Sequence, residues 1–470
     1  MFIHSGAMTT RVRTPKVNGL RFARDTFRHG LRTEGPALDG TADIVRLTFN
    51  RHPLFVVRHP DHVDHVLRAQ VDRYRKSVEY ETLRAVLGLS LFTDEGGSWR
   101  RHRTLIGPVL ARPRLADLFE LMVDPVDRLL TTLDRDGDRF ELEMAEAMTA
   151  LTLDVVGSAL FGRGMADLAR RIGPNVTAGL RGAERATRTL LIADPPAVLV
   201  RAIAAAIRHS PVLPRRQARM REVMRTIDET VWGVITDRRA EPGRADDLLG
   251  LLLSVRDADG RPLPLKRVRD EAATFMLAGH ETTANALSWM WYLLATNPGA
   301  RNRLLAEVDE VLGDRRPVFA DLPRLAWTTA CFMEAMRLYP PAWSIPRRCV
   351  IGDDIAGHSI PRGSRVIIPI YAVHRDPRWW PAPETFDPGR FLPGAARQHH
   401  RAAYLPFGGG RRVCAGQHFA VIEATLLTAM LSRRYTFDQV PGFPVEPEAT
   451  LTLRPRHGLR MIARRRLGSS

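Results

Sequence analysis

The sequence has very few cysteines, only three in 470 residues, and they are far apart: Cys331, Cys349 and Cys414. An odd number at wide spacing argues against a disulfide framework and against a zinc site built on cysteine pairs. It favours a reducing compartment, and we expect the cytoplasm. The first residues, MFIHSGAMTTRVRTPKVNG, contain no apolar run, so we expect neither a signal peptide nor a transmembrane anchor.

Lysine is equally scarce, because Lys16, Lys76 and Lys266 are the only lysines among 69 basic residues. Arginine therefore carries nearly all of the positive charge, and the formal net charge is +17. Nucleic-acid-binding surfaces combine clustered basic residues with aromatic ones. Here the arginines are dispersed and aromatic residues form only 7% of the chain, so we expect no nucleic-acid partner. An acidic partner protein suits this charge better.

No Gly/Ser linker or internal repeat divides the chain. Amphipathic helical patterns run from about 83 to 311, short β segments follow from 349 to 370, and residues 375–396 are irregular. This order predicts one large domain, mainly α with small β sheets. The most apolar stretch, residues 189–207, is read either as two buried helix ends or as a segment that touches a membrane or lines an entrance.

Cys414 follows a loop with almost no side chains, FGGGRRVCAG, residues 407–416. A dinucleotide-binding loop would need a glycine where Val413 stands. A zinc site could use Cys414 and His418, but no second ligand pair has suitable spacing. No local signature supplies the base of a cysteine hydrolase. A single thiolate that ligates haem iron remains.

The same segment fits Phe-x-x-Gly-x-Arg-x-Cys-x-Gly at every fixed position. It therefore resembles the haem loop of cytochromes P450. The resemblance implies that Cys414 ligates the iron, that Arg412 pairs with a haem propionate and that Phe407 packs beside the sulfur. Gly410 and Gly416 complete the motif, and we expect them in the cofactor site.

A second stretch, MLAGHETTANALSWMWYLL, lies in a helical pattern that runs from 268 to 296. A metalloprotease motif is incomplete, because Ala284 stands where the second histidine is needed. A kinked helix with a solvated polar face is one alternative. The stretch is similar to the oxygen-binding helix of cytochromes P450. That resemblance places Ala278 near the haem and makes Glu281 and Thr282 the acid–alcohol pair that delivers protons during dioxygen activation.

Glu334 and Arg337 are three residues apart, which places them on one helix face. Alone, this spacing is more typical of an ordinary surface pair. Its position before Pro-x-Arg-Phe, which contains Arg390, and before the cysteine loop is similar to the order in cytochromes P450. The resemblance implies a structural triad that serves folding and assembly of the haem pocket.

Two further stretches concern the haem propionates. Trp99 and Arg103 are four residues apart in an expected helix, and an indole N–H and a guanidinium can both donate to a carboxylate. A surface arginine is the alternative reading of Arg103. The stretch PPAWSIPRRCV resembles the P450 strand whose arginine reaches a propionate. Arg347 fits that position best, and Arg348 stays open.

The resemblance covers about residues 40–465 and leaves an N-terminal extension, 1–39, and a tail, 466–470. It implies the cytochrome P450 fold, a triangular prism with a long central helix over haem b (iron protoporphyrin IX). The implied reaction is a monooxygenation that uses dioxygen on a lipophilic small molecule. We favour a fatty acid or another lipid, while terpenoid, sterol and polyketide substrates stay open.

The chain carries no flavin or iron–sulfur signature, so electrons from NAD(P)H are expected only through a separate ferredoxin and ferredoxin reductase. Arg100, Arg101 and Arg411 are candidates for the docking face. A haem-thiolate sensor or a peroxide-driven peroxygenase are the alternatives. A sensor has no need for Glu281 and Thr282, and a peroxygenase can dispense with the pair, so its presence favours dioxygen chemistry.

Overall fold

The computed structural model describes residues 16–18, 42–48, 53–162, 195–209, 215–240, 247–395 and 399–466. The expected extensions, 1–39 and 466–470, lie outside these ranges except for residues 16–18 and 466. Residues 189–194 of the apolar stretch also lie outside the described residues.

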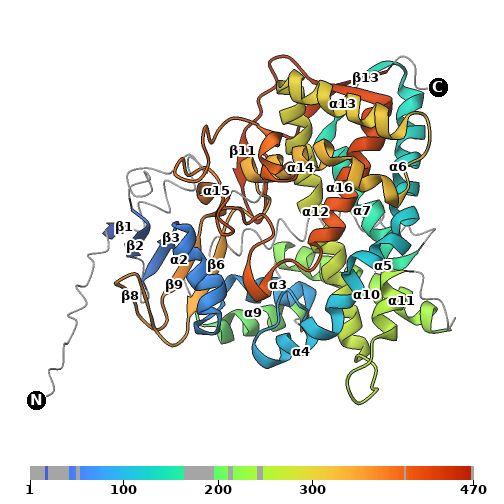
Figure 1. Cartoon of the computed structure of the whole chain (residues 1–470). Coiled ribbons are helices and arrows are strands. Elements are labelled where there is room, and N and C mark those ends of the chain that lie inside the picture. Colours follow the sequence, from blue (N-terminus) through green and yellow to red (C-terminus); the bar gives the residue numbers. More distant parts are fainter. Residues whose placement is uncertain are drawn as a thin grey trace, which may run out of the picture.

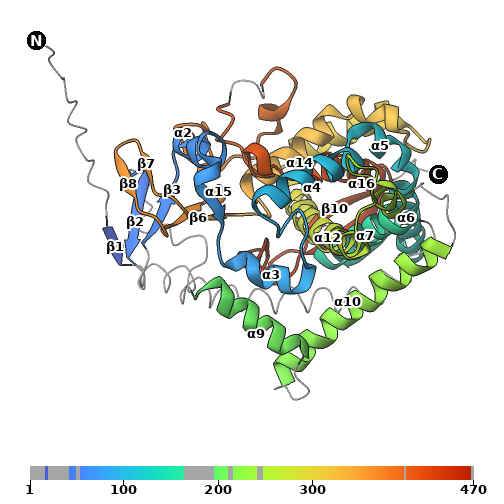
Figure 2. The same ribbon diagram turned by 90° about the horizontal axis from the view of Figure 1, so that it is seen from below.

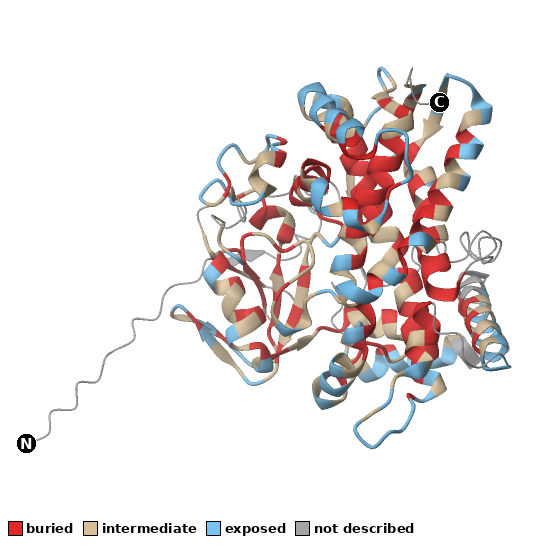
Figure 3. Ribbon diagram, turned by 45° about the vertical axis from the view of Figure 1, so that its right-hand side comes forward, coloured by how far each residue is buried: buried red, intermediate tan, exposed pale blue. Residues whose placement is uncertain are grey.

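One long helix, α12 (Leu265–Thr296), runs through the middle of the helical part of the molecule (Figure 1). Proline lies at both of its borders, at Pro264 and Pro298, as expected because proline interrupts helical hydrogen bonding. The helices that contact it include α3 (Glu79–Leu87), α7 (Met144–Phe161), α10 (Arg215–Ala240), α11 (Leu248–Ser254), α13 (Pro298–Leu312), α14 (Ala326–Leu338) and α16 (Gln417–Arg434). Figure 3 shows that buried residues concentrate where these helices meet.

The remaining helices are shorter or lie further out. Among the described residues they are α2 (Pro60–Asp64), α4 (Gly96–Ile106), α5 (Arg112–Asp117), α6 (Phe119–Leu133), α9 (Ala197–His209) and α15 (Ile370–Val373). Figure 2 shows α9 and α10 along one edge of the molecule, with α9 against α3.

The strands form small sheets beside the helical part. The largest has the order β1-β2-β3-β9-β6-β4, built from β1 (Lys16–Asn18), β2 (Ile44–Thr48), β3 (Leu54–Val57), β9 (Arg365–Ile368), β6 (Ile345–Cys349) and β4 (Tyr74–Lys76). The others are β10-β13-β5 (Tyr435–Gln439, Arg460–Arg465, Arg139–Glu143), β11-β12 (Pro447–Ala449, Leu453–Pro455) and β7-β8 (Asp353–Ile355, His358–Ile360). The predicted fold class, mainly α with small β sheets, is confirmed.

Helices α7 and α12 approach closely because a glycine lies at their contact. A Cβ on Gly279 would lie only 3.1 Å from Val156 on α7. One turn away on α7, the hydroxyl of Thr152 donates to the backbone carbonyl of His280 (3.0 Å). Among the described helices, α7 is the one long and apolar enough to cross a membrane, and 67% of it is buried inside the protein.

A buried ion pair connects α14 to the irregular segment that follows α15. Glu334 and Arg337 are both fully buried and form two hydrogen bonds, from Nε at 2.7 Å and from Nη2 at 2.8 Å. Arg337 also donates to the carbonyl oxygens of His374 (2.9 Å) and Pro383 (2.7 Å). Arg390 lies 3.5 Å from Glu334, so the structure brings the expected triad together.

Replacing Arg337 by methionine keeps much of its volume but leaves the Glu334 carboxyl group buried without its partner. Because an unpaired buried charge is costly, we expect Arg337→Met to lower the free energy of unfolding by about 3–5 kcal/mol. Denaturant unfolding of the holoprotein measures it. Arg225→Ala, which breaks an exposed ion pair with Glu222, is the control and should change little. A loss below about 1 kcal/mol in Arg337→Met, the range of surface pairs, would contradict the structural role.

Candidate active site

A cavity of about 610 Å³ lies between α12, α4, β6 and the cysteine loop. The tip of the β11-β12 hairpin and the segment between α3 and α4 also line it. Its apolar lining includes Leu83, Leu91, Phe92, Val156, Phe275 and Leu451. A mostly apolar cavity with a few charged side chains is typical of a small-molecule site.

The sulfur of the cysteine loop faces this cavity. The backbone N–H of Cys414 donates to the carbonyl of Phe407 (2.9 Å), which closes the loop just before α16. Protein surrounds Cys414, yet the residue is exposed to the cavity. Burial raises the pKa of the Cys414 thiol, and the backbone N–H of Gly416 and the charge of Arg103 oppose this rise. A metal ion at the sulfur would favour the thiolate.

The glycines of the loop have different environments. Gly410 has a φ of +69°, in the region that favours glycine, and a side chain there would overlap the carbonyl oxygen of Leu67. The structure thus accounts for Gly410 by backbone packing rather than by clearance for a ligand. Phe407 and Gly416 do line the cavity, as does Gly408.

Cationic side chains gather on one wall of the cavity. Lys76, Arg347 and Arg412 all line it and are close enough to repel one another. Glu95 is the nearest counter-ion, 2.5 Å from Nη2 of Arg412. The guanidinium of Arg412 also lies 5.7 Å from the ring centre of Trp99, another cavity residue.

The sequence did not single out Lys76 as a site residue. Its Nζ donates to the backbone carbonyls of Leu91 (3.2 Å) and Asp94 (2.9 Å), and burial lowers the pKa of Lys76 to about 7. The available signal was its rarity, since only three lysines occur among 69 basic residues. The compact ammonium group of a lysine and the planar guanidinium group of an arginine bind ligands differently. An arginine at position 76 would therefore not be equivalent to the lysine.

The geometry of β6 distinguishes Arg347 from Arg348, between which the sequence left the propionate contact open. Successive side chains of a strand point to opposite faces. On β6, Arg347 is buried, lines the cavity and lies opposite Lys76 of β4. Arg348 donates to the carbonyl of Gly363 (3.3 Å) on the other face. The structure therefore favours Arg347 as the contact for a ligand.

Helix α12 carries the expected acid and alcohol, but their side chains have different partners. Ala278 and Thr282 line the cavity, and the hydroxyl of Thr282 donates back to the carbonyl of Ala278 (2.7 Å). Glu281 instead points to the β11-β12 hairpin, where the hydroxyl of Thr452 donates to its Oε1 (2.9 Å). The two neighbours in sequence thus serve two sides of the helix.

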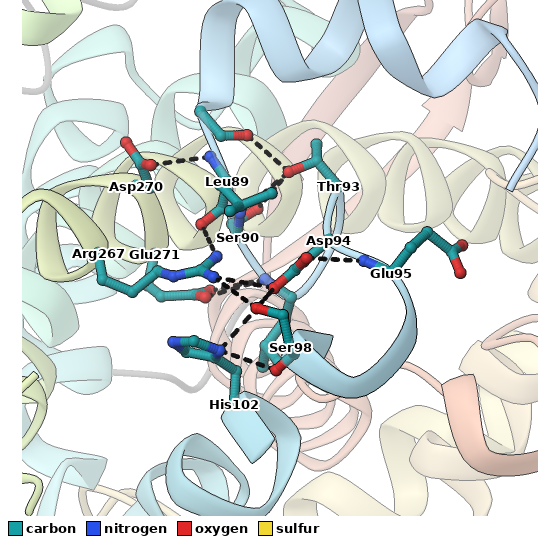
Figure 4. A network of polar contacts seen from close by, with 12 residues as sticks. Leu89, Ser90, Thr93, Asp94, Glu95, Ser98, His102, Arg267, Asp270 and Glu271 are labelled. Carbon is teal, nitrogen blue, oxygen red and sulfur yellow. Dashed lines mark hydrogen bonds and ion pairs between the residues drawn. The ribbon is translucent and has the colours of Figure 1, made fainter. Parts of the chain in front are cut away.

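A polar network connects α12 to the part of the cavity wall that precedes α4 (Figure 4). The sequence did not predict this network. Arg267 donates to Asp94 (2.9 Å) and to Ser98 (3.1 Å), next to Trp99. The carboxyl group of Glu271 accepts from the backbone N–H of Leu91 (2.9 Å), and burial raises the pKa of Glu271 to about 8. No short sequence motif marks such contacts, because their partners are more than 160 residues apart.

One sulfur that faces an apolar cavity, beside cationic side chains able to bind carboxylates, is the site of a haem-thiolate protein. A family model described as Cytochrome P450 matches residues 40–461, and the chain belongs to this family. It is a cytochrome P450 monooxygenase. The family implies a haem, dioxygen and redox partners.

Similar proteins agree with this assignment over most of the chain. Cytochrome P450 132 of Mycobacterium tuberculosis is 48% identical over 425 residues, which cover 90% of this chain and 91% of that protein. Cyclooctatin synthase of Streptomyces melanosporofaciens is 36% identical over 425 residues, 89% of this chain and 88% of its own. The crystal structure of the cytochrome P450DA heme domain has a TM-score of 0.79 at 25% identity and covers 91% of this chain and 90% of its own. The expected fold is thereby confirmed.

The residues present fit a haem. In the described part of the chain, no group of three or more His, Cys, Asp or Glu side chains could hold a metal ion. Nη1 of Arg412 is buried and has no hydrogen-bond partner among the described residues. Three cationic side chains, Lys76, Arg347 and Arg412, lie beside the carboxylates of Glu95 and Asp94. Asp94 also pairs with Arg267, so haem propionates would find cationic partners on this wall.

Exchange of Cys414 for serine removes the sulfur and leaves the loop nearly unchanged in size. We expect Cys414→Ser to lose the thiolate absorption band of the reduced carbon monoxide complex, because an alcohol is a poorer iron ligand than a thiolate. Cys331→Ser and Cys349→Ser, at the two other buried cysteines, are controls and should keep the band. A band that persists in Cys414→Ser would refute the ligand assignment.

Proposed function

We propose that the chain hydroxylates a lipophilic small molecule in this cavity with electrons from separate redox proteins. The observation that carries the proposal is that Cys414 and Thr282 line one apolar cavity from different walls. When bound, haem supplies the activation of dioxygen and the transfer of one oxygen atom to a C–H bond. The protein holds the cofactor, orients the substrate, excludes water and manages protons.

The cofactor would be haem b held by side chains from four segments. Cys414 is the iron ligand in this proposal, and Phe407 packs beside it. Propionate contacts are assigned to Arg347 and Arg412, whose guanidinium groups favour carboxylates. Further contacts come from Trp99, Arg103 and Lys76, which line the same cavity.

Thr282 and Glu281 are assigned to proton delivery. The hydroxyl of Thr282 is at the cavity and can pass a proton once it leaves the carbonyl of Ala278. The carboxyl group of Glu281 is held at the hairpin by Thr452 and supplies protons from that side. A positioned acid or alcohol of this kind contributes roughly 10²–10⁴-fold to a rate that depends on proton transfer.

The cavity lining supports this substrate class. Aliphatic and aromatic side chains dominate it, which favours a fatty acid or another lipid over a polar metabolite. Helix α9 supports the same class, since it lies against α3, whose Tyr80 and Leu83 line the cavity. Val198 and Ile203 of α9 are exposed and offer a lipophilic substrate an apolar surface near the cavity.

Electrons would come from NAD(P)H through a ferredoxin reductase and an acidic ferredoxin in the cytoplasm. The docking face is assigned to Arg100, Arg101 and Arg411, which are all exposed. Two of them share one counter-ion, because Asp72 lies 2.6 Å from Arg100 and 3.6 Å from Arg411. Arg411 is also only three residues from Cys414. This brings a positive patch to the sulfur side of the site.

Removal of the Thr282 hydroxyl should uncouple electron transfer from product formation. With the best-converted lipid of a panel of dodecanoic acid, farnesol and cholesterol, we expect Thr282→Ala to lower product per NADPH by roughly tenfold or more and to release hydrogen peroxide instead. Thr282→Ser keeps a hydroxyl and should stay coupled. An unchanged product yield in Thr282→Ala, or wild-type protein that converts no lipid, would favour the sensor or peroxygenase alternatives.

Charge reversal on the docking face should weaken ferredoxin binding without changing the active site. We expect Arg411→Glu and Arg101→Glu to raise the KM for an acidic ferredoxin several-fold at low salt, and less at high salt, because ions screen exposed charges. The control is Arg460→Glu on β13, at the other end of the molecule in Figure 1. An equal effect of all three substitutions would show only a dependence on net charge.

A further inference from the structure

Three side chains on one face of α12 hold the turn between β11 and β12. They are four residues apart, at Glu281, Asn285 and Trp289, and therefore form one stripe along the helix. Asn285 donates to the hydroxyl of Thr452 (3.1 Å), and Trp289 donates to the carbonyl of Leu453 (3.2 Å).

Thr452 stands at the centre of these contacts. Its side chain accepts from Asn285 and donates to the carboxylate of Glu281 (2.9 Å). A hydroxyl has a single proton. Because the hydroxyl oxygen of Thr452 accepts the N–H of Asn285, its own proton is directed to the carboxylate of Glu281. Thr452 and Asn285 are only 6% and 8% exposed, so water cannot easily replace either contact. The three groups thus form one polarised chain that ends on the carboxylate.

The same turn also forms part of the cavity wall. Ala449, Thr450 and Leu451 all line the cavity. Hydrogen bonds hold the turn, because the backbone N–H (3.0 Å) and the hydroxyl (2.9 Å) of Thr450 both donate to the carbonyl of Thr452. Trp343, another cavity residue, donates to the carbonyl of Thr450 (2.9 Å). A molecule that presses on residues 449–451 therefore acts on Thr452 through a rigid connection.

We propose that Thr452 is a positioning residue that fixes the carboxylate of Glu281 and couples it to the substrate-contacting turn. The proposal rests on the proton-delivery role proposed above for Glu281 and Thr282. Thr452 touches neither substrate nor cofactor in this assignment. Its hydroxyl sets where Glu281 points, and the turn transmits the presence of substrate to that setting. Proton supply from Glu281 thereby depends on whether substrate occupies the cavity.

The test uses the holoenzyme with the best-converted lipid of the panel named above. We expect Thr452→Val, which keeps the shape but removes the hydroxyl, to raise the fraction of electrons lost as peroxide several-fold and to change the solvent kinetic isotope effect. The dissociation constant for the lipid, read from the spectral shift of the ferric protein, should change less than the peroxide fraction. Thr452→Ser restores the hydroxyl and should restore both wild-type values.

Thr328→Val is a matched control. The hydroxyl of Thr328 on α14 also donates to a glutamate carboxylate, Oε2 of Glu307 on α13 (2.7 Å). Thr328 is fully buried but lies outside the cavity lining. Its loss should leave the peroxide fraction and the isotope effect unchanged. Equal uncoupling in the Thr328 and Thr452 variants would mean general destabilisation and would overturn the proposal.

A double-substitution cycle isolates the coupling between the two residues. If Thr452 acts through Glu281, then adding Thr452→Val to Glu281→Gln should add almost no further uncoupling, because the carboxylate is already gone. Additive effects would overturn the proposal. If Thr282→Ala uncouples the enzyme and Thr452→Val does not, the positioning role fails while the proposed function stands. If neither uncouples it, the proposed proton-delivery route itself fails.

Discussion

The buried pair of Glu334 and Arg337 is the interaction on which the rest of the site depends. The segment from α15 to the cysteine loop has little regular structure, so side chains must satisfy its backbone. Arg337 donates to three carbonyl oxygens of that segment, those of His374, Pro383 and Thr385. His374 then accepts at Nε2 from the backbone N–H of Leu405 (2.7 Å), close to the loop. Burial lowers the pKa of His374 to about 3, which keeps the ring neutral and able to accept.

This chain of contacts explains how a loop that ends on one cysteine can be held firmly. The loop itself is pinned by the hydrogen bond from Cys414 to Phe407 and by the packing of Gly410 against Leu67. On the opposite wall, the position of α12 is fixed by the close packing of Gly279 against α7. The distance between the sulfur and the helix is therefore fixed by core packing on both sides, and the cavity is the space left between them.

Sequence patterns predicted the features that depend on local spacing. The long helix, the position of Cys414, the helix face shared by Glu334 and Arg337 and the small sheets all follow from short-range periodicity and from motif order. What the sequence could not predict depends on contacts between distant segments. The carboxylate of Glu281 accepts a hydrogen bond from Thr452, 171 residues away, and no local signal marks that partner.

Two walls of the cavity, the segment before α4 and the β11-β12 turn, are both attached to α12. Near its start, Asp270 and Glu271 accept from the backbone N–H groups of Leu89 and Leu91 in the segment before α4. In its middle, Glu281 and Asn285 hold the β11-β12 turn at Thr452. Because buried polar contacts are costly to break singly, each wall moves only with the helix or at the expense of these bonds. Two segments of the cavity wall with little regular structure are thus held in place by side chains of α12 that do not themselves line the cavity.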